Sequence, residues 1–168
     1  MNTFLEKISA YQFLNYFIPG TAFIVLINYL GIYNLPLDNV LFILLGGYCS
    51  GMVMSRIGSL VVEPCLRKCR FVIFASYKDY KDAENNMPKV PILVTENNMY
   101  RTLLATFLSL MIIYSMNLIT CVRGFMHSKW MPLVVLVGLV LLFLFSYRKQ
   151  TSYVKRNIEY FCRKRDNQ

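Results

Sequence analysis

Four long stretches of this chain contain no Asp, Glu, Lys or Arg, and this pattern constrains the fold more than any other feature. The stretches are Ile8–Leu37, Asn39–Ser55, Thr102–Val122 and Trp130–Tyr147. Because an α-helix rises about 1.5 Å per residue, about 20 apolar residues cross the roughly 30 Å hydrocarbon core of a bilayer. The second stretch is short, so its helix must continue past Arg56 toward Val62. The pattern predicts an all-α membrane protein with four transmembrane helices.

The distribution of Lys and Arg predicts which side of the membrane each connection faces. Eight of the 18 basic residues lie between the second and third stretches, and seven lie in the tail from Arg148 to Arg165. Only Arg123 and Lys129 fall between the third and fourth stretches. Because cytoplasmic loops retain basic residues during insertion, both termini and the long middle connection are expected in the cytoplasm.

The composition also favours the bilayer. Hydrophobic residues make up 56% of the chain and charged residues 16%, against about 25% charged residues in a soluble domain. The net charge of +9 then follows largely from topology, and the lipid bilayer with its anionic headgroups is the expected partner. The first apolar run is too long for a signal peptide and lacks a small-x-small cleavage site, so we expect a retained anchor.

These signals divide the chain into seven segments. They are an interfacial amphipathic helix at 1–16, transmembrane helices at 17–34, 39–62, 98–122 and 129–147, a small cytoplasmic subdomain at 63–97 and a basic cytoplasmic tail helix at 148–168. A helix break at Ile18–Pro19 is favoured over one long helix kinked at Pro19, because proline is well tolerated in the first turn of a helix. The tail helix either continues the fourth span or folds under the bilayer.

The middle segment at 63–97 is too short to build an independent core. Its two apolar stretches, Phe71–Phe74 and Pro91–Val94, are expected to pair as short strands or to pack on the tail and the membrane face. Thr95–Asn98 offers capping side chains for the third transmembrane helix.

A ladder of small residues occupies one face of the second predicted span. Gly47, Gly51, Ser55 and Ser59 follow one another at intervals of four residues. In lipid, helices associate where small side chains let the backbones approach closely. The ladder therefore packs within one subunit, against the first or third span, or it forms a subunit interface or lines a pore.

Arg56 and Glu63 lie near the cytoplasmic end of the same span. If the helix continues to Arg67, spacings of seven and four place the three charges nearly on one stripe. A charge this close to the bilayer must snorkel, pair or face water. Arg56 is therefore either a positive-inside anchor or the partner of Glu63, at the inner mouth of a channel or at a joint between subunits.

No grouping of residues in the sequence points to catalysis. His127 is the only histidine, and none of the five cysteines completes a zinc set. The sequence also contains neither a glycine-rich phosphate loop nor a Ser/His/Asp set. We therefore expect a protein that is not an enzyme and that needs no metal or cofactor.

Basic residues interleaved with tyrosines form the expected cytoplasmic surface. The cationic positions are Arg67, Lys68, Arg70, Lys78, Lys81, Lys155 and Arg156. Cations beside aromatic rings suit an anionic nucleotide or oligonucleotide, and the same residue types are typical of a membrane interface. The surface is interpreted either as a site for an anionic ligand or partner protein or as an interfacial anchor.

Three short blocks resemble segments of small bacterial membrane proteins. They are Asn15–Gly20, Ser55–Leu60 with Glu63–Pro64, and Glu96–Arg101. In size and layout the chain is similar to the membrane subunits of the Hailong and Kiwa anti-phage systems. The resemblance implies a multi-pass protein of the bacterial inner membrane, a homo-oligomer such as a tetramer, that acts with a cytoplasmic partner protein or a nucleotide signal. It assigns no functional residue.

Two functions from different classes follow. The first is an oligomeric inner-membrane channel or pore-type effector in antiviral defence, gated by a cytoplasmic anionic ligand or partner. In it the face from Gly47 to Ser59 lines or closes the pore, with Arg56 and Glu63 at the inner mouth. The second is a non-conducting membrane scaffold that recruits a soluble partner to the inner leaflet.

Overall fold

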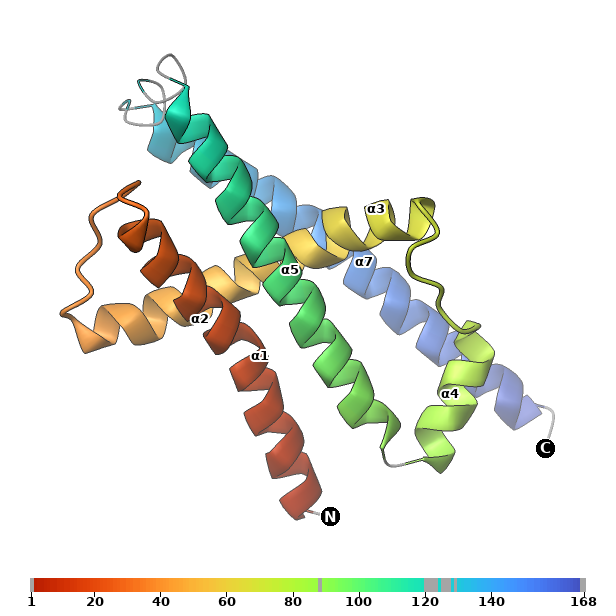
Figure 1. The fold of residues 1–168 in the computed structure, drawn as a ribbon. Coiled ribbons are helices and arrows are strands. Elements are labelled where there is room, and N and C mark those ends of the chain that lie inside the picture. The colour runs from red at the N-terminus through yellow and green to blue at the C-terminus, as the bar shows by residue number, and fades with distance from the viewer. Residues whose placement is uncertain (1, 88, 120–123, 125–127, 129, 167–168) are drawn as a thin grey trace.

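The computed structural model describes residues 2–87, 89–119, 124, 128 and 130–166, and side chains from Phe13 onward except at 85–86, 157–158 and 161–166. Every element within these residues is helical (Figure 1). The elements are α1 (Asn2–Tyr29), α2 (Val40–Ile57), the π-helical turn η1 (Gly58–Val62), α3 (Glu63–Lys68), α4 (Tyr77–Asn86), α5 (Val90–Leu118) and α7 (Met131–Asp166). The prediction of an all-α fold is confirmed.

Three helices are long and apolar enough to cross a membrane, as judged by length and composition. They are Val40–Lys68, Val90–Leu118 and Met131–Arg156, and α1 adds a shorter apolar helix at Phe13–Tyr29. These are the helices of a multi-pass membrane protein. A fourth crossing and the side on which the termini lie stay predictions.

Helix α1 is continuous through Pro19, so the expected break at Ile18–Pro19 is wrong, and the segments expected at 1–16 and 17–34 share one helix as far as Tyr29. Pro19 is among the most completely buried side chains of the described part. Proline removes one backbone hydrogen bond, but packing by neighbouring helices stabilises such a turn in a membrane protein. An interfacial position for the first residues of α1 stays a prediction.

Helix α2 continues through η1 into α3, as its expected extension past Arg56 toward Val62 requires. The continuation contains a π-helical turn that the sequence pattern did not reveal. Helix α3 ends where Arg70 takes a left-handed backbone with φ of 58°. The amide of Phe71 then donates to the Leu66 carbonyl at 3.0 Å and closes the helix.

Helix α5 begins at Val90, with Pro91 in its first turn, so Pro91–Val94 is helical and forms no strand. The expected start near Thr95–Asn98 is therefore wrong. The Thr95 hydroxyl donates instead to the Pro91 carbonyl at 2.8 Å, inside the helix. Helix α5 ends at Leu118, and residues 120–122 of the expected third span lie outside the described residues.

Helix α7 carries the fourth apolar stretch and the basic tail in one element of 36 residues. This confirms the alternative in which the tail continues the span. Only 6% of the most apolar 18-residue part of α7 is buried within the chain. In contrast, α1 packs closely against both α2 and α5. The core lies between α1 and α5, around Ile27, Ile32 and Leu110.

The two ends of the molecule differ in what they contain. Figure 1 shows the N-terminus, α4 and the C-terminal end of α7 at one end, and the α1–α2 connection with the last turns of α5 at the other. The helix formed by α2, η1 and α3 crosses α5 and α7 obliquely between these ends. The crossing brings η1 next to the middle of α7.

Candidate functional site

The small-residue ladder packs within the chain. A Cβ atom added to Gly20 of α1 would lie 1.8 Å from the Gly47 carbonyl oxygen, and one added to Gly51 would lie 1.7 Å from the Tyr16 carbonyl oxygen. The backbones of α1 and α2 therefore touch at these glycines. Of the two alternatives that the sequence left open, the structure shows packing inside one subunit, against the first apolar helix.

The lower part of the same face meets other helices. Ser55 and Ser59 are buried, and a Cβ atom added to Gly58 would lie 3.2 Å from the Arg101 carbonyl oxygen of α5. The face from Gly47 to Ser59 is thus covered within the chain by α1 and α5. Its role in a pore or in an interface between subunits stays a prediction.

Glu63, the first residue of α3, lies at the centre of a charge cluster. Its carboxylate contacts Arg101 of α5 at 2.6 Å, Arg67 at 3.6 Å and Lys149 of α7 at 3.9 Å. The side chain of Glu63 is only 16% exposed. We call these four residues the Glu63 junction. One carboxylate thus joins three helices, because its partners come from α3, α5 and α7.

The π-turn explains why Lys149 is needed at this junction. The Glu63 amide donates to the Gly58 carbonyl, as a π-turn requires. The next residue, Pro64, has no N–H to offer the Ser59 carbonyl. The Lys149 ammonium donates to that Ser59 carbonyl instead. A cation on α7 therefore satisfies a backbone acceptor that the sequence of α2–α3 leaves without a donor.

Arg56 does not join this cluster by an ion pair. Among the described side chains, the ion-pair partners of Glu63 are Arg67, Arg101 and Lys149. Of the two alternatives for Arg56, the pair with Glu63 is therefore wrong, and the role of a positive-inside anchor stays a prediction. The expectation assumed an uninterrupted α-helix, and the additional residue in a π-turn rotates everything beyond it by about 100°. The backbone carbonyl of Arg56 accepts a hydrogen bond from the Ser59 hydroxyl at 3.2 Å.

Two partners in the junction were missed when the sequence was read alone, namely Arg101 and Lys149. A signal for them exists in the charge pattern. Arg101 directly precedes the stretch beginning at Thr102, and Lys149 lies two residues after Tyr147. Charges that border apolar stretches lie at a similar membrane depth, so they are natural partners for Glu63.

A second cluster joins α4 to the basic part of α7. The ring of Tyr77 makes edge contacts with Tyr153 at 6.4 Å and with Tyr160 at 6.2 Å. The Tyr160 hydroxyl donates to the Asp82 carboxylate, and the Arg156 guanidinium lies 5.7 Å from the Tyr77 ring centre. We call this the α4–α7 contact. It holds the short polar helix α4 on α7 through the face that carries Tyr77.

The pKa values of two tyrosines and one lysine in and beside this contact are shifted by hydrogen bonds and burial. The hydrogen bond to Asp82 raises the pKa of Tyr160. Burial, with the nearby Glu84 carboxylate, raises the pKa of Tyr80 as well. Burial lowers the pKa of Lys81, but its hydrogen bond to Glu84 and its Coulombic interactions with Tyr153, Glu84 and Tyr77 together outweigh burial and leave that pKa raised. Both tyrosines and the lysine therefore keep their neutral-pH protonation state over a wider pH range.

The structure divides the predicted basic surface between two places. Arg67, Lys68 and Arg70 are exposed at the end of α3, where the Arg67 guanidinium lies 4.5 Å from the Phe74 ring centre. The other predicted cations surround the α4–α7 contact. They are Lys78, Lys81, Lys155 and Arg156. Lys81 and Lys155 are paired there with acidic neighbours on their own helices, Glu84 and Glu159.

The described residues contain no group of three or more His, Cys, Asp or Glu side chains arranged to hold a metal ion. His127 lies outside these residues. Comparisons of the chain with known protein families, with curated proteins and with solved structures gave no match.

Proposed function

We propose that this chain is a membrane scaffold that presents a cationic helical arm to an anionic cytoplasmic partner. The arm consists of α7 beyond Tyr147 together with α4. The observation that carries the proposal is the unbroken path of α7 from an apolar span into this basic arm. A rigid helix of this kind holds charged groups at a fixed distance from the membrane.

The charge distribution suits an anionic partner. Exposed cations of the arm include Lys78 and Lys155, and Arg156 lies beside an aromatic ring. Cations and rings together bind phosphate-bearing or acidic surfaces more strongly than cations alone. The partner class is an acidic protein surface or a nucleotide signal.

The arrangement of the ends supports a four-span topology with both termini in the cytoplasm. The N-terminus, α4 and the C-terminal end of α7 lie at one end of the molecule (Figure 1). The same end carries most of the Lys and Arg residues, as the positive-inside rule favours. With this topology in the bacterial inner membrane, the arm would lie on the cytoplasmic side.

An oligomeric channel or pore-type effector is the second candidate, and one observation favours it. Only 6% of the most apolar 18-residue part of α7 is buried within the chain. Nearly all of the surface of this part is therefore available to lipid or to other copies of the chain. Since α1 covers the ladder of α2, contacts between copies in such a channel would fall to α7. Bacterial antiviral defence would be the setting for either candidate.

The test compares two double charge reversals in the full chain. Lys78→Glu with Lys155→Glu alters the arm, and Lys68→Glu with Arg70→Glu, at two exposed positions at the end of α3, is a matched control. Quantitative co-purification from native membranes should lose a soluble partner with the arm variant and keep it with the control. Equal loss with both pairs would contradict the proposal.

Ion flux separates the two candidates. The purified chain in liposomes should show no flux above that of protein-free liposomes if it is a scaffold. Flux that depends on protein concentration, and that the arm variant changes, would favour the channel instead.

A further inference from the structure

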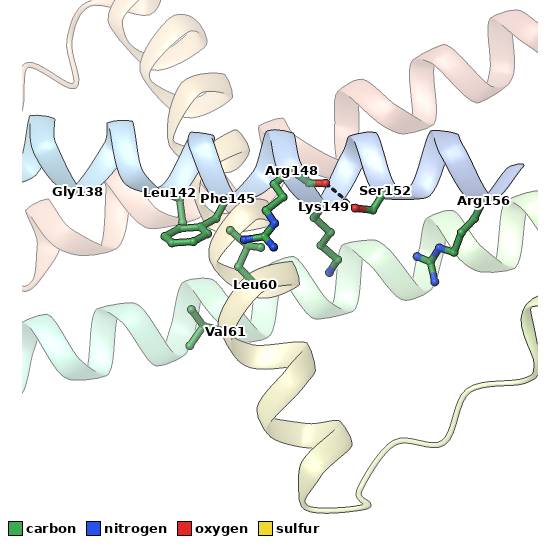
Figure 2. A pocket seen from close by; sticks show the side chains of 9 residues that line it. All are labelled: Leu60, Val61, Gly138, Leu142, Phe145, Arg148, Lys149, Ser152 and Arg156. Atoms are coloured by element: carbon green, nitrogen blue, oxygen red, sulfur yellow. Dashed lines mark hydrogen bonds between the residues drawn. The ribbon is translucent and has the colours of Figure 1, made fainter. Parts of the chain in front are cut away.

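A groove of about 650 Å³ runs along α7 where η1 crosses it. Leu60 and Val61 of η1 form one side, and Leu142 and Phe145 of α7 contribute to the other (Figure 2). This part of the groove is apolar. The groove shares Lys149 with the Glu63 junction, whose other three residues do not line it.

One end of the groove is cationic. Arg148, Lys149 and Arg156 line it together with Ser152, and Figure 2 shows the three basic side chains extending from the same side of α7. Lys149 is engaged by Glu63 and by the Ser59 carbonyl. No carboxylate among the described side chains forms an ion pair with Arg148. Arg148 therefore brings an uncompensated positive charge to the groove.

The length of the groove matches one leaflet of a bilayer. Its lining extends along α7 from Gly138 to Arg148 before the polar end begins. Ten residues of helix correspond to about 15 Å, which is half the roughly 30 Å hydrocarbon thickness. An acyl chain whose headgroup lies at Arg148 would therefore end near Gly138.

We propose that this groove binds one anionic phospholipid. Its phosphate lies against Arg148, and one acyl chain lies along Phe145 and Leu142 toward Gly138. A free phosphate or a nucleotide would use the cations but would leave the apolar side of the groove without a partner. A zwitterionic lipid would fill the apolar side, but its own cationic group would compete with Arg148 for the phosphate and leave the cationic end with an excess of positive charge. An anionic lipid satisfies both ends.

This inference does not depend on the arm's partner. The groove and the arm share the residues just beyond Tyr147, but the partner test changes Lys78 and Lys155, neither of which lines the groove. A chain that recruits no soluble protein would still bind the lipid, so the two proposals fail in different experiments.

Native mass spectrometry of the purified full chain in detergent tests the headgroup end. Phosphatidylglycerol and phosphatidylcholine with identical acyl chains are titrated separately. Phosphatidylglycerol should bind with a stoichiometry of one, and Arg148→Gln should weaken it about fivefold, as expected for the loss of one cation near an anionic lipid. Lys68→Gln, which removes an exposed charge outside the groove, should leave binding unchanged.

Three results would overturn the proposal. The first is equal binding of both lipids, and the second is equal weakening by Arg148→Gln and Lys68→Gln. The third is displacement of the lipid by millimolar glycerol phosphate, which would identify a site for soluble anions.

A second pair of variants tests the apolar end. A Cβ atom added to Gly138 meets nothing within 4 Å, so Gly138→Phe fills the groove without a backbone clash. It should weaken phosphatidylglycerol binding while thermal stability stays unchanged. Val135→Phe, on an exposed position outside the groove, is the control. Unchanged lipid binding by Gly138→Phe would also overturn the proposal.

Discussion

The Arg101 guanidinium lies 2.6 Å from the Glu63 carboxylate across a sequence separation of 38 residues. This contact ties α5 to the helix that contains the π-turn. Lys149 adds α7 to the same carboxylate. A single acidic residue near the end of a predicted span thus joins three of the long helices.

We expect Glu63→Gln to destabilise the chain by about 2 kcal/mol, because Arg101 loses a charge-assisted hydrogen bond in a site of low exposure. Thermal unfolding of the detergent-purified protein measures this. Glu96→Gln is the control, since Glu96 is exposed and no ion pair to it is found among the described residues. A loss of stability no larger than that of the control would contradict the role of the junction.

We expect Lys149→Met and Pro64→Ala to be energetically coupled. Alanine at position 64 restores an N–H that is able to donate to the Ser59 carbonyl. The loss caused by Lys149→Met, about 1.5–3 kcal/mol for a hydrogen bond to a charged group, should therefore be smaller in the Pro64→Ala background. A double-mutant cycle on unfolding free energies measures the coupling. Strict additivity would show that the lysine does not replace the missing amide.

We expect Gly51→Leu to prevent close contact between α1 and α2. Its Cβ would lie 1.7 Å from the Tyr16 carbonyl oxygen, so the loss should be about 3 kcal/mol or more. Gly46→Ala is the matched control, because its nearest neighbour would be 3.9 Å away. Cysteine cross-linking between α1 and α2 reports the contact directly. Unaltered cross-linking in Gly51→Leu would contradict the packing described here.

The α4–α7 contact should weaken in the alkaline range. The pKa of Tyr160 is raised above its usual value of 10.0 by the hydrogen bond to Asp82. A raised pKa in the folded state stabilises the contact below pH 10, and this stabilisation is lost as the pH rises through the folded pKa. NMR titration of labelled tyrosine should show the Tyr160 pKa falling toward 10.0 in Asp82→Asn. An unchanged Tyr160 pKa would contradict the hydrogen bond.

Much of the fold could be predicted from charge and apolar length. The stretches Asn39–Ser55 and Trp130–Tyr147 predicted α2 and α7. Because Asn39–Ser55 is too short to cross a bilayer, its helix was expected to continue past Arg56. These features depend on the bilayer, which imposes the same length on every crossing. These predictions do not require knowing how the helices pack against one another.

Several departures depend on how distant segments pack together, and others depend on local backbone geometry, such as the start of α5 at Val90 with Pro91 in its first turn. Pro19 remains inside α1 because α2 packs on that turn, and the sequence of α1 alone cannot reveal this. The π-turn at Gly58–Val62 changed the partner of Glu63 from Arg56 to Arg101. The small-residue ladder was visible, but its partner was not, because a groove of this kind fits any helix that offers a small residue.

The 36-residue length of α7 turns its crossing with η1 into a pivot. Asp166 lies about 25 Å along the helix from Lys149, so a 10° tilt at the crossing would move that tip by about 4 Å. A change in bilayer thickness that tilts α7 would therefore displace the charged C-terminal end of the helix sideways, although the helix itself stays straight.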